Sequence, residues 1–267
     1  MFPQPTPAVK SILIITIAIF FIGYVPGIGD ILDKVAILYP VTSENFNPFQ
    51  FFTYMFMHAG GRHLIGNMLI IFFFGPMVEA VWGSQRFLVF YLACGLGASL
   101  IYGGVKYYEH YDMERDYAML VQHPTPVGMW NFIRDHGDGT RQWVLEKIED
   151  YESNPQDTYL ENESLRVLGR LKNEINQYQG GLLGASGAVF GVLMALGLMF
   201  PENTIHLLIP PIPIKIKYFV FILGAMEYFA FIRAAPGDNV AHNVHLAGML
   251  VAFLLIKFGS FKGRYNR

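Results

Sequence analysis

Long apolar runs recur along this chain, separated by shorter polar stretches. A helix needs roughly 20 mostly apolar residues to cross the hydrocarbon core of a bilayer, and six runs approach that length. They cover residues 9–28, 63–82, 87–105, 183–200, 216–233 and 242–258. The pattern predicts an all-α membrane protein with six transmembrane helices. Composition agrees, because 53% of the residues are hydrophobic and mean hydropathy is +0.34, whereas soluble domains contain roughly 45–50% apolar residues.

The segment 106–180 differs from the rest, since it holds 14 acidic and 8 Lys or Arg residues and no run long enough to span. Apolar residues recur in it at helical spacing, with a break at 154–155. These are Val144, Ile148 and Tyr151, then Leu165, Leu168, Leu171, Ile175 and Tyr178. We expect a small helical cap on the outer side of the membrane. Two interpretations are open: a tolerated loop insertion, or a lid or substrate-docking element.

The first outer loop, residues 32–61, is rich in aromatic residues and Met but is interrupted by Pro and Asn. This composition suits a segment that lies in the headgroup region. We therefore expect three parts: residues 1–105 with spans one to three and a membrane-associated first loop, the polar outer insertion 106–180, and residues 181–267 with spans four to six and a basic tail.

Basic residues predict the orientation of the spans. If the N-terminus lies inside, the inner loops and tails carry more Lys and Arg than the short outer loops, as cytoplasmic segments do. The inner set is Lys10, Arg86, Lys215, Lys217, Lys262, Arg264 and Arg267, and the outer set is Lys34, Arg62 and Arg233. We expect both termini in the cytoplasm. The short basic N-terminus shows neither a cleavage pattern nor a presequence, which favours a bacterial plasma membrane.

Polar side chains at membrane depth are costly, so each is a candidate for function. The candidates are His58, His63, Asn67, Glu79, Ser186, Glu227, His242, Asn243 and His245. Because successive spans alternate in direction, the second, fourth and sixth all begin on the outer side. Side chains near these three starts can therefore meet at a similar depth.

Ser186 and His245 are a pair suited to acyl transfer. A serine hydroxyl becomes nucleophilic when a base takes its proton, and histidine is a suitable base. Attack on a carbonyl creates an oxyanion, which the backbone N–H groups of the first turn around Ser186 and the side chains of His63 and Asn67 can stabilise. No acidic residue on the sixth span or beside it clearly orients His245, and Asp238 is only weakly placed, in the preceding loop. We predict a Ser–His dyad.

Glycines around the serine fit this interpretation. Gly184 and Gly187 leave room for substrate and allow the sixth span to approach. Close approach of two helices in a membrane requires small residues at the contact. The small residues are Gly187 and Gly191 on the fourth span and Ala247, Gly248 and Ala252 on the sixth.

Four motifs occur in order along the chain: "HAGGRHLIGN", "GPMVEAVWG", "GASGAVFG" and "HNVHLAG". In order and position they resemble the motifs of rhomboid intramembrane serine proteases, and the resemblance covers nearly the whole chain outside 106–180. It implies a six-helix rhomboid-like bundle with an extracytoplasmic helical insertion between helices three and four. The sequence does not contain the GxSxG pattern of a nucleophile elbow, because position 188 is Ala.

The resemblance implies that Ser186 is the nucleophile, that His245 is the general base, and that His63 and Asn67 form the side-chain part of the oxyanion hole. Phe190 stands where rhomboids place an aromatic ring against the catalytic histidine. Three departures from the family pattern are Phe49-Gln50 in place of Trp-Arg, Val244 in place of Ala, and Ala252 in place of Gly. The first alters how the loop is anchored in lipid, and the others predict slightly looser packing of the sixth helix.

Other polar residues receive supporting roles. We expect His58 to shape the first loop by hydrogen bonding, and His242 to act in a loop or beside the site, with the role of catalytic base as its alternative. Glu79 matches a residue that the family uses structurally, as an acceptor or protonated donor that ties the first loop or neighbouring helices. A proton relay is the alternative for Glu79. Glu227 matches no motif, and its role stays open.

The expected function is cleavage of membrane-anchored proteins in or just outside their transmembrane segments, without a cofactor and without nucleic acid. A non-catalytic rhomboid-like protein that binds transmembrane helices is one alternative. A metal enzyme or transporter that uses His58, His63, His242 and His245 is another, although it leaves Ser186 without a purpose. Cys94 is the only cysteine, so no intrachain disulfide forms, and we expect it to be buried.

Overall fold

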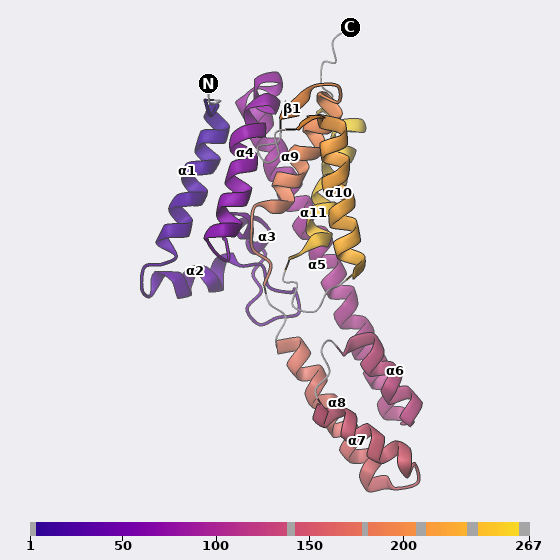
Figure 1. Cartoon of the computed structure of the whole chain (residues 1–267). Helices are drawn as coiled ribbons and strands as arrows, with labels where there is room; N and C mark the ends of the chain where they lie inside the picture. The colour runs from indigo at the N-terminus through magenta and orange to yellow at the C-terminus, as the bar shows by residue number, and fades with distance from the viewer. Residues whose placement is uncertain (1–3, 138–141, 178–180, 207–211, 234–239, 262–267) are drawn as a thin grey trace. The chain divides into compact units, whose positions relative to one another are not determined.

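The computed structural model describes residues 4–137, 142–177, 181–206, 212–233 and 240–261. Within them the protein is all-α apart from one two-stranded hairpin (Figure 1). The chain forms two compact units. Unit 1 comprises Met1–Tyr39, Asn45–Gly103 and Gly181–Arg267, and unit 2 comprises Pro40–Glu44 and Gly104–Gly180. The residues of the sequence predictions that lie outside the described ranges are Tyr178, Asp238, Lys262, Arg264 and Arg267.

Unit 1 holds most of the apolar helices. Its elements are α1 (Pro7–Ile22), α2 (Ile28–Ala36), α3 (Gln50–Thr53), the 3-10 turn η1 (Tyr54–Phe56), α4 (Gly61–Trp82), the first part of α5 (Ser84–Gln122), α9 (Ser186–Met199), β1 (Thr204–His206), β2 (Pro213–Lys215), α10 (Ile216–Arg233) and α11 (His242–Lys257). Strands β1 and β2 pair in antiparallel fashion, with Ile205 opposite Ile214.

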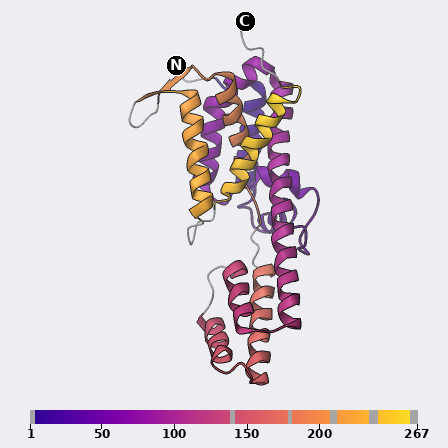
Figure 2. The same cartoon turned by 90° about the vertical axis from the view of Figure 1, so that its right-hand side faces the viewer.

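Helix α9 lies at the centre of unit 1 and contacts α4, α10 and α11 (Figures 1 and 2). Nine of its residues are buried, among them Gly187, Phe190 and Gly191. A helix that is apolar on all sides is stable when other helices surround it. Cys94 of α5 is also buried, as predicted. The serine of the candidate site therefore stands on the most enclosed helix of the unit.

The first predicted span is shorter than expected. We predicted residues 9–28, but α1 ends at Ile22 and α2 begins at Ile28. The chain turns between them, and Gly27 there has a φ of 79°, a conformation that favours glycine. Among the described helices, only α4 and α5 have the length and apolar composition needed to cross a bilayer. Helices α1, α9 and α11 are also apolar but shorter.

Glu79 of α4 fastens the start of α1. Its carboxylate accepts hydrogen bonds from the backbone N–H groups of Ala8 (2.9 Å) and Val9 (3.0 Å), and from the hydroxyl groups of Thr6 and, at 2.6 Å, Ser84. The first N–H groups of a helix have no partner within it, and a carboxylate also interacts favourably with the helix dipole there. Glu79 thus ties neighbouring helices together as an acceptor, and none of these hydrogen bonds goes to the first loop.

The first loop is organised around Gln50, which is fully buried. Its side-chain oxygen accepts from the backbone N–H groups of Tyr39 (3.3 Å) and Asn47 (3.1 Å), and its amide donates to the backbone oxygens of Lys34 (3.0 Å) and Asn45 (2.9 Å). The sequence singled out this position only as a departure from the family pattern. In this protein the glutamine uses both ends of its amide to hold the loop backbone.

Unit 2 has its own hydrophobic core. Helix α5 continues to Gln122, so the first residues of the predicted insertion extend the third apolar helix instead of beginning a separate structure. The remaining helices are α6 (Pro126–His136), α7 (Gln142–Ser153) and α8 (Thr158–Gln177). The predicted break at 154–155 lies between α7 and α8. The core includes Val144, Ile148, Tyr151, Leu168 and Leu171 of the predicted stripes, with Leu165 and Ile175 packed against it.

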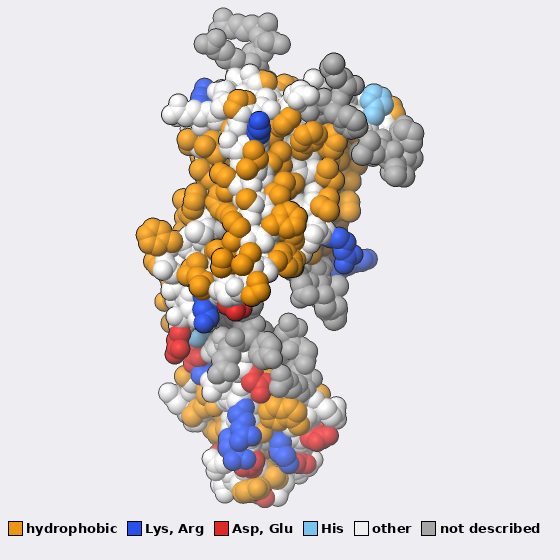
Figure 3. All heavy atoms as spheres, turned by 90° about the vertical axis from the view of Figure 1, so that its left-hand side faces the viewer, with side chains coloured by type: hydrophobic (Ala, Val, Ile, Leu, Met, Phe, Trp, Pro, Cys, Tyr) orange, Lys and Arg blue, Asp and Glu red, His pale blue; other side chains and the backbone are white. Residues whose placement is uncertain are grey.

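The surface of unit 1 is apolar where its helices are exposed. Figure 3 shows hydrophobic side chains spread over the helices of this unit, whereas charged side chains gather over unit 2. On α1, Ile14, Ile15 and Phe21 are exposed, with Phe21 at 64%. Contiguous exposed apolar surface of this kind is typical of a protein that meets another apolar phase. It suits contact with lipid.

Candidate active site

The chain just before α9 is fixed by the first loop. Leu38 and Leu182 exchange backbone hydrogen bonds of 3.0 and 2.8 Å, and the N–H of Gly184 donates to the oxygen of Tyr54 at 2.9 Å. Gly184 has a φ of 126°, where a side chain would be strained. This turn allows α9 to begin at Ser186.

Ser186 and His245 are in hydrogen-bonding contact. The Oγ of Ser186 lies 2.8 Å from Nε2 of His245. His245 is buried on α11, and its ring stacks on Phe190, with centroids 4.4 Å apart and planes 7° apart. Phe190 lies one turn after Ser186 on α9, so the same helix presents the hydroxyl and the aromatic surface that limits the tilt of the imidazole.

The approach of α9 and α11 depends on glycine. A Cβ on Gly248 would lie 1.9 Å from the backbone oxygen of Gly187, and a Cβ on Gly187 would lie 3.2 Å from Val244. The looser packing that Val244 and Ala252 predict stays a prediction, while Gly187 and Gly248 meet closely. Gly191 faces α11 as expected, since a Cβ there would lie 3.4 Å from the backbone oxygen of Gly248, and it is also close to α5, since the same Cβ would lie 2.7 Å from Cys94.

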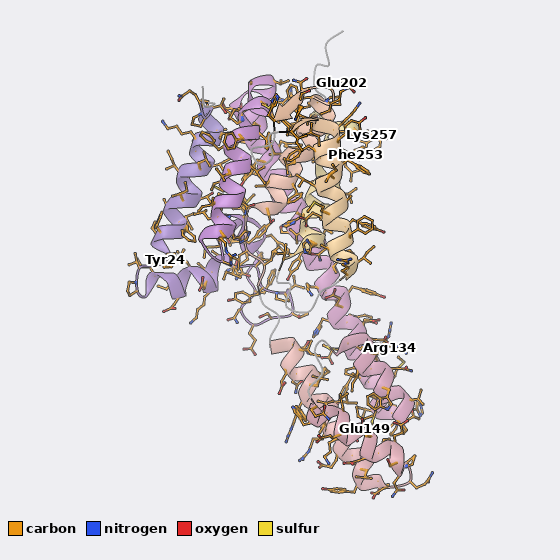
Figure 4. All side chains as sticks on the ribbon, in the orientation of Figure 1. Tyr24, Arg134, Glu149, Glu202, Phe253 and Lys257 are labelled. Carbon is orange, nitrogen blue, oxygen red and sulfur yellow. The ribbon has the colours of Figure 1, made fainter. Side chains whose placement is uncertain are left out.

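Figure 4 helps to place the site along the bundle. Lys257, at the end of α11, and Glu202, just after α9, are labelled at one end of the bundle, and Tyr24 is labelled toward the other. Since Ser186 and His245 lie near the starts of α9 and α11, they lie away from the Lys257 end. Hydrogen bonds from Lys215 and Lys217 lower the pKa of Glu202 to about 2, so this end carries paired charges.

Three polar side chains form a cluster against the turn before α9. A Cβ on Gly184 would lie 2.7 Å from Nε2 of His63, which places this ring against the turn before α9. The rings of His63 and His58 meet edge to face with centroids 4.9 Å apart. Asn67 is buried, one turn after His63 on α4, and its Nδ2 lies 3.1 Å from Nε2 of His58. The structure thus brings the predicted oxyanion residues together near the start of α9.

A carboxylate also reaches this site. Oε2 of Glu227, on α10, lies 2.7 Å from Nδ1 of His245 and 2.5 Å from Nδ1 of His242. The prediction that no acidic residue on the sixth span or beside it is placed to orient His245 is therefore wrong. The described residues contain two groups of side chains that could hold a metal ion, because their possible ligand atoms lie within 4.8 Å of one another. One group is Glu227, His242 and His245. The other group is Asp112, Asp116 and His136.

The rhomboid domain family matches residues 45–113 and 167–260 of the chain, which together carry every residue of this site. The chain belongs to the rhomboid family. It is therefore a membrane-integral protein. The residues between the two matched segments all fall in unit 2.

One curated relative extends the comparison. This rhomboid is 24% identical over 220 residues to "RHOMBOID-like protein 12, mitochondrial" of Arabidopsis thaliana, across 79% of this chain and 47% of the relative. The chain thus spans about half the length of the relative that it matches. The relative's name places that protein in mitochondria, so the comparison gives no support to a bacterial plasma membrane, which stays a prediction.

His58 of this rhomboid is suited to hold Asn67 in place. Burial and the neighbouring His63 lower the pKa of His58 to about 4. The imidazole is therefore neutral at physiological pH, and its Nε2 can accept a hydrogen bond from the Asn67 amide. The acceptor is lost only as pH falls toward 4, where His58 becomes protonated. This hydrogen bond uses one of the two N–H groups of the Asn67 amide, and the other is the predicted donor to an oxyanion.

We expect His58→Leu to lower kcat by about 10-fold with little change in KM. Removing an oxyanion donor outright costs about 10²–10³-fold in kcat. In the predicted role of Asn67 as such a donor, the variant retains the donor and removes only its anchor. His58→Gln, whose side-chain oxygen can accept the Asn67 bond, should retain most activity. Initial rates of cleavage near pH 7 measure the difference. Equal rates for the Leu variant and the wild type would show that His58 does not position Asn67.

Proposed function

We propose that this protein is a serine endopeptidase that cleaves transmembrane segments of membrane-anchored proteins near the outer face of the bilayer. The observation that carries the proposal is the 2.8 Å contact between Ser186 Oγ and His245 Nε2. A hydroxyl bonded to an imidazole, beside donors that can stabilise an anion, is the arrangement that acyl transfer requires.

The catalytic cycle uses groups already in place. His245 takes the proton of Ser186 as the oxygen attacks the scissile carbonyl, and the resulting oxyanion is stabilised by N–H groups at the start of α9 with His63 and Asn67. The N–H of Val189 donates to the oxygen of Ala185, the residue before α9, at 3.0 Å, and the N–H groups before Val189 in this first turn have no partner inside the helix. His245 then gives the proton to the leaving amine and later activates the water that hydrolyses the acyl-enzyme.

The substrate must unwind locally before it is cut. A peptide bond inside a regular transmembrane helix is shielded, and its carbonyl is already hydrogen-bonded. Small or helix-weakening residues at the cleaved bond are therefore preferred. In this proposal the six membrane helices are α1, α4, α5, α9, α10 and α11, both termini lie in the cytoplasm, and the insertion lies outside. The excess of Lys and Arg in the proposed inner segments supports this orientation.

Purified protein in liposomes tests the function directly. It should cut a single-span test substrate, and a fluorophosphonate probe should modify Ser186, as mapped by mass spectrometry of the labelled peptide. A chelator should leave the rate unchanged. A protein that binds the substrate but neither cuts it nor reacts with the probe would instead be a non-catalytic binder of transmembrane helices. Cleavage that stops with chelator would favour a metal enzyme.

A further inference from the structure

The candidate base His245 is in contact with a glutamate on a third helix, in addition to Ser186. Glu227 of α10 and His245 of α11 are both largely buried, with side-chain exposures of 17% and 11%. The carboxylate oxygen Oε2 lies 2.7 Å from Nδ1 of His245, while the other ring nitrogen of that histidine lies 2.8 Å from Ser186 Oγ. The imidazole therefore lies between a carboxylate and a hydroxyl, each at hydrogen-bonding distance.

We propose that Glu227 is the positioning residue for His245, so that the protein works with the three-residue arrangement Ser186–His245–Glu227 instead of a dyad. This inference rests on the proposed function. It adds a residue that matches none of the four sequence motifs and that lies on a helix which those motifs do not include.

The physical reason is the choice of tautomer. An ionised carboxylate can only accept hydrogen bonds, so its contact with Nδ1 requires the proton to be on that nitrogen. Nε2 then presents its lone pair to Ser186, which is the form that can remove the hydroxyl proton. When His245 becomes an imidazolium, the same carboxylate stabilises the positive charge. Phe190 stacks on the face of the ring and cannot choose between the two nitrogens.

His242 explains how a carboxylate can be held at this depth. Its Nδ1 lies 2.5 Å from the same Oε2 atom, and its ring meets that of His245 at 85° with centroids 6.0 Å apart. An ionisable group in a membrane helix requires partners to offset its desolvation. Two imidazole N–H groups supply them, and because they converge on one oxygen they also fix the rotamer of Glu227. His242 therefore acts on the base through the carboxylate.

Glu227→Gln is the main test, since it keeps the size of the side chain and removes its charge. We expect kcat to fall by about 10² to 10⁴-fold with KM nearly unchanged, as expected when the base loses its tautomer and charge partner. The same substitution at Glu202, which is exposed and paired with Lys215 and Lys217, is the matched control and should keep wild-type rates. Thermal unfolding in detergent checks that both variants remain folded.

Two further measurements separate positioning from a structural role. Acetate or formate added to Glu227→Ala should restore part of the lost rate, because a small carboxylate can occupy the vacated space. In protein labelled with ¹⁵N-histidine, the strongly downfield proton of a carboxylate-bound Nδ1 should be present in the wild type and absent in the Gln variant. A Gln variant that folds less well but shows unchanged kcat when folded would overturn the proposal.

The outcomes also distinguish this inference from the proposed function. If the wild type cleaves substrate and Glu227→Gln cleaves it within twofold of the same rate, the positioning role is wrong and the protease assignment stands. If the wild type neither cleaves nor reacts with the serine-directed probe, the assignment itself fails. If a chelator removes wild-type activity, the three side chains hold a metal ion and the proposed positioning role is wrong.

Discussion

Ser186→Ala is expected to abolish cleavage, with a fall in kcat of about 10⁶-fold, to the background rate. The substitution removes the oxygen that attacks the carbonyl, and nothing else in the contact with His245 can replace it. Because the side chain is small and only partly buried, the fold and the affinity for a transmembrane substrate should remain. Cleavage in proteoliposomes, together with a binding measurement on the same samples, reports both results.

Ser11→Ala is the matched control. Ser11 is exposed on α1 and donates to the backbone oxygen of Pro7 at 3.0 Å within its own helix, so the change should leave the rate as it is. Activity that survives Ser186→Ala would remove the basis for an acyl-enzyme. Loss of activity in both serine variants would point to general damage and would leave the nucleophile unidentified.

Gly248→Ala is expected to cost at least about 10²-fold in kcat, although Gly248 takes no part in the chemistry. The new Cβ would lie 1.9 Å from the backbone oxygen of Gly187, whereas ordinary contact begins near 3.4 Å. Helices α9 and α11 must therefore separate by more than about 1 Å, and a misplacement of that size costs about 10²-fold. Overpacking should also lower the free energy of unfolding by about 2 kcal/mol.

Gly104→Ala is a suitable comparison, because it makes the same chemical change inside α5 where a Cβ meets no atom within 4 Å. Alanine is the better helix former by about 1 kcal/mol, so this variant should be as active as the wild type and at least as stable. Rates and thermal unfolding midpoints for the two variants test the argument. Wild-type activity in Gly248→Ala would contradict the argument, because it would show that the reaction does not require this close spacing of α9 and α11.

The sequence predicted most of the site because its signals are local. Runs of apolar residues predicted the long helices of unit 1, and motifs around Ser186 and His245 marked where two of them begin. The alternation of direction then placed both residues on the same side. Their contact follows from these two facts together with small residues that allow close approach. The polar character of 106–180 likewise indicated a separate part, although hydropathy did not reveal that helix α5 continues into it.

Only the tertiary structure decided which side chains complete the site. Helix α10 is apolar around most of its circumference, so periodicity could not indicate which face meets α11, and Glu227 had no motif to assign it. The four hydrogen bonds of Gln50 depend on loop backbone from separate turns, which sequence spacing does not specify. The sequence also did not predict that α1 ends at Ile22, because the turn that follows it lies inside a continuous apolar run. Hydrophobic pattern determines which segments enter the membrane, whereas the rotation and spacing of helices, set by packing, determine which polar groups meet.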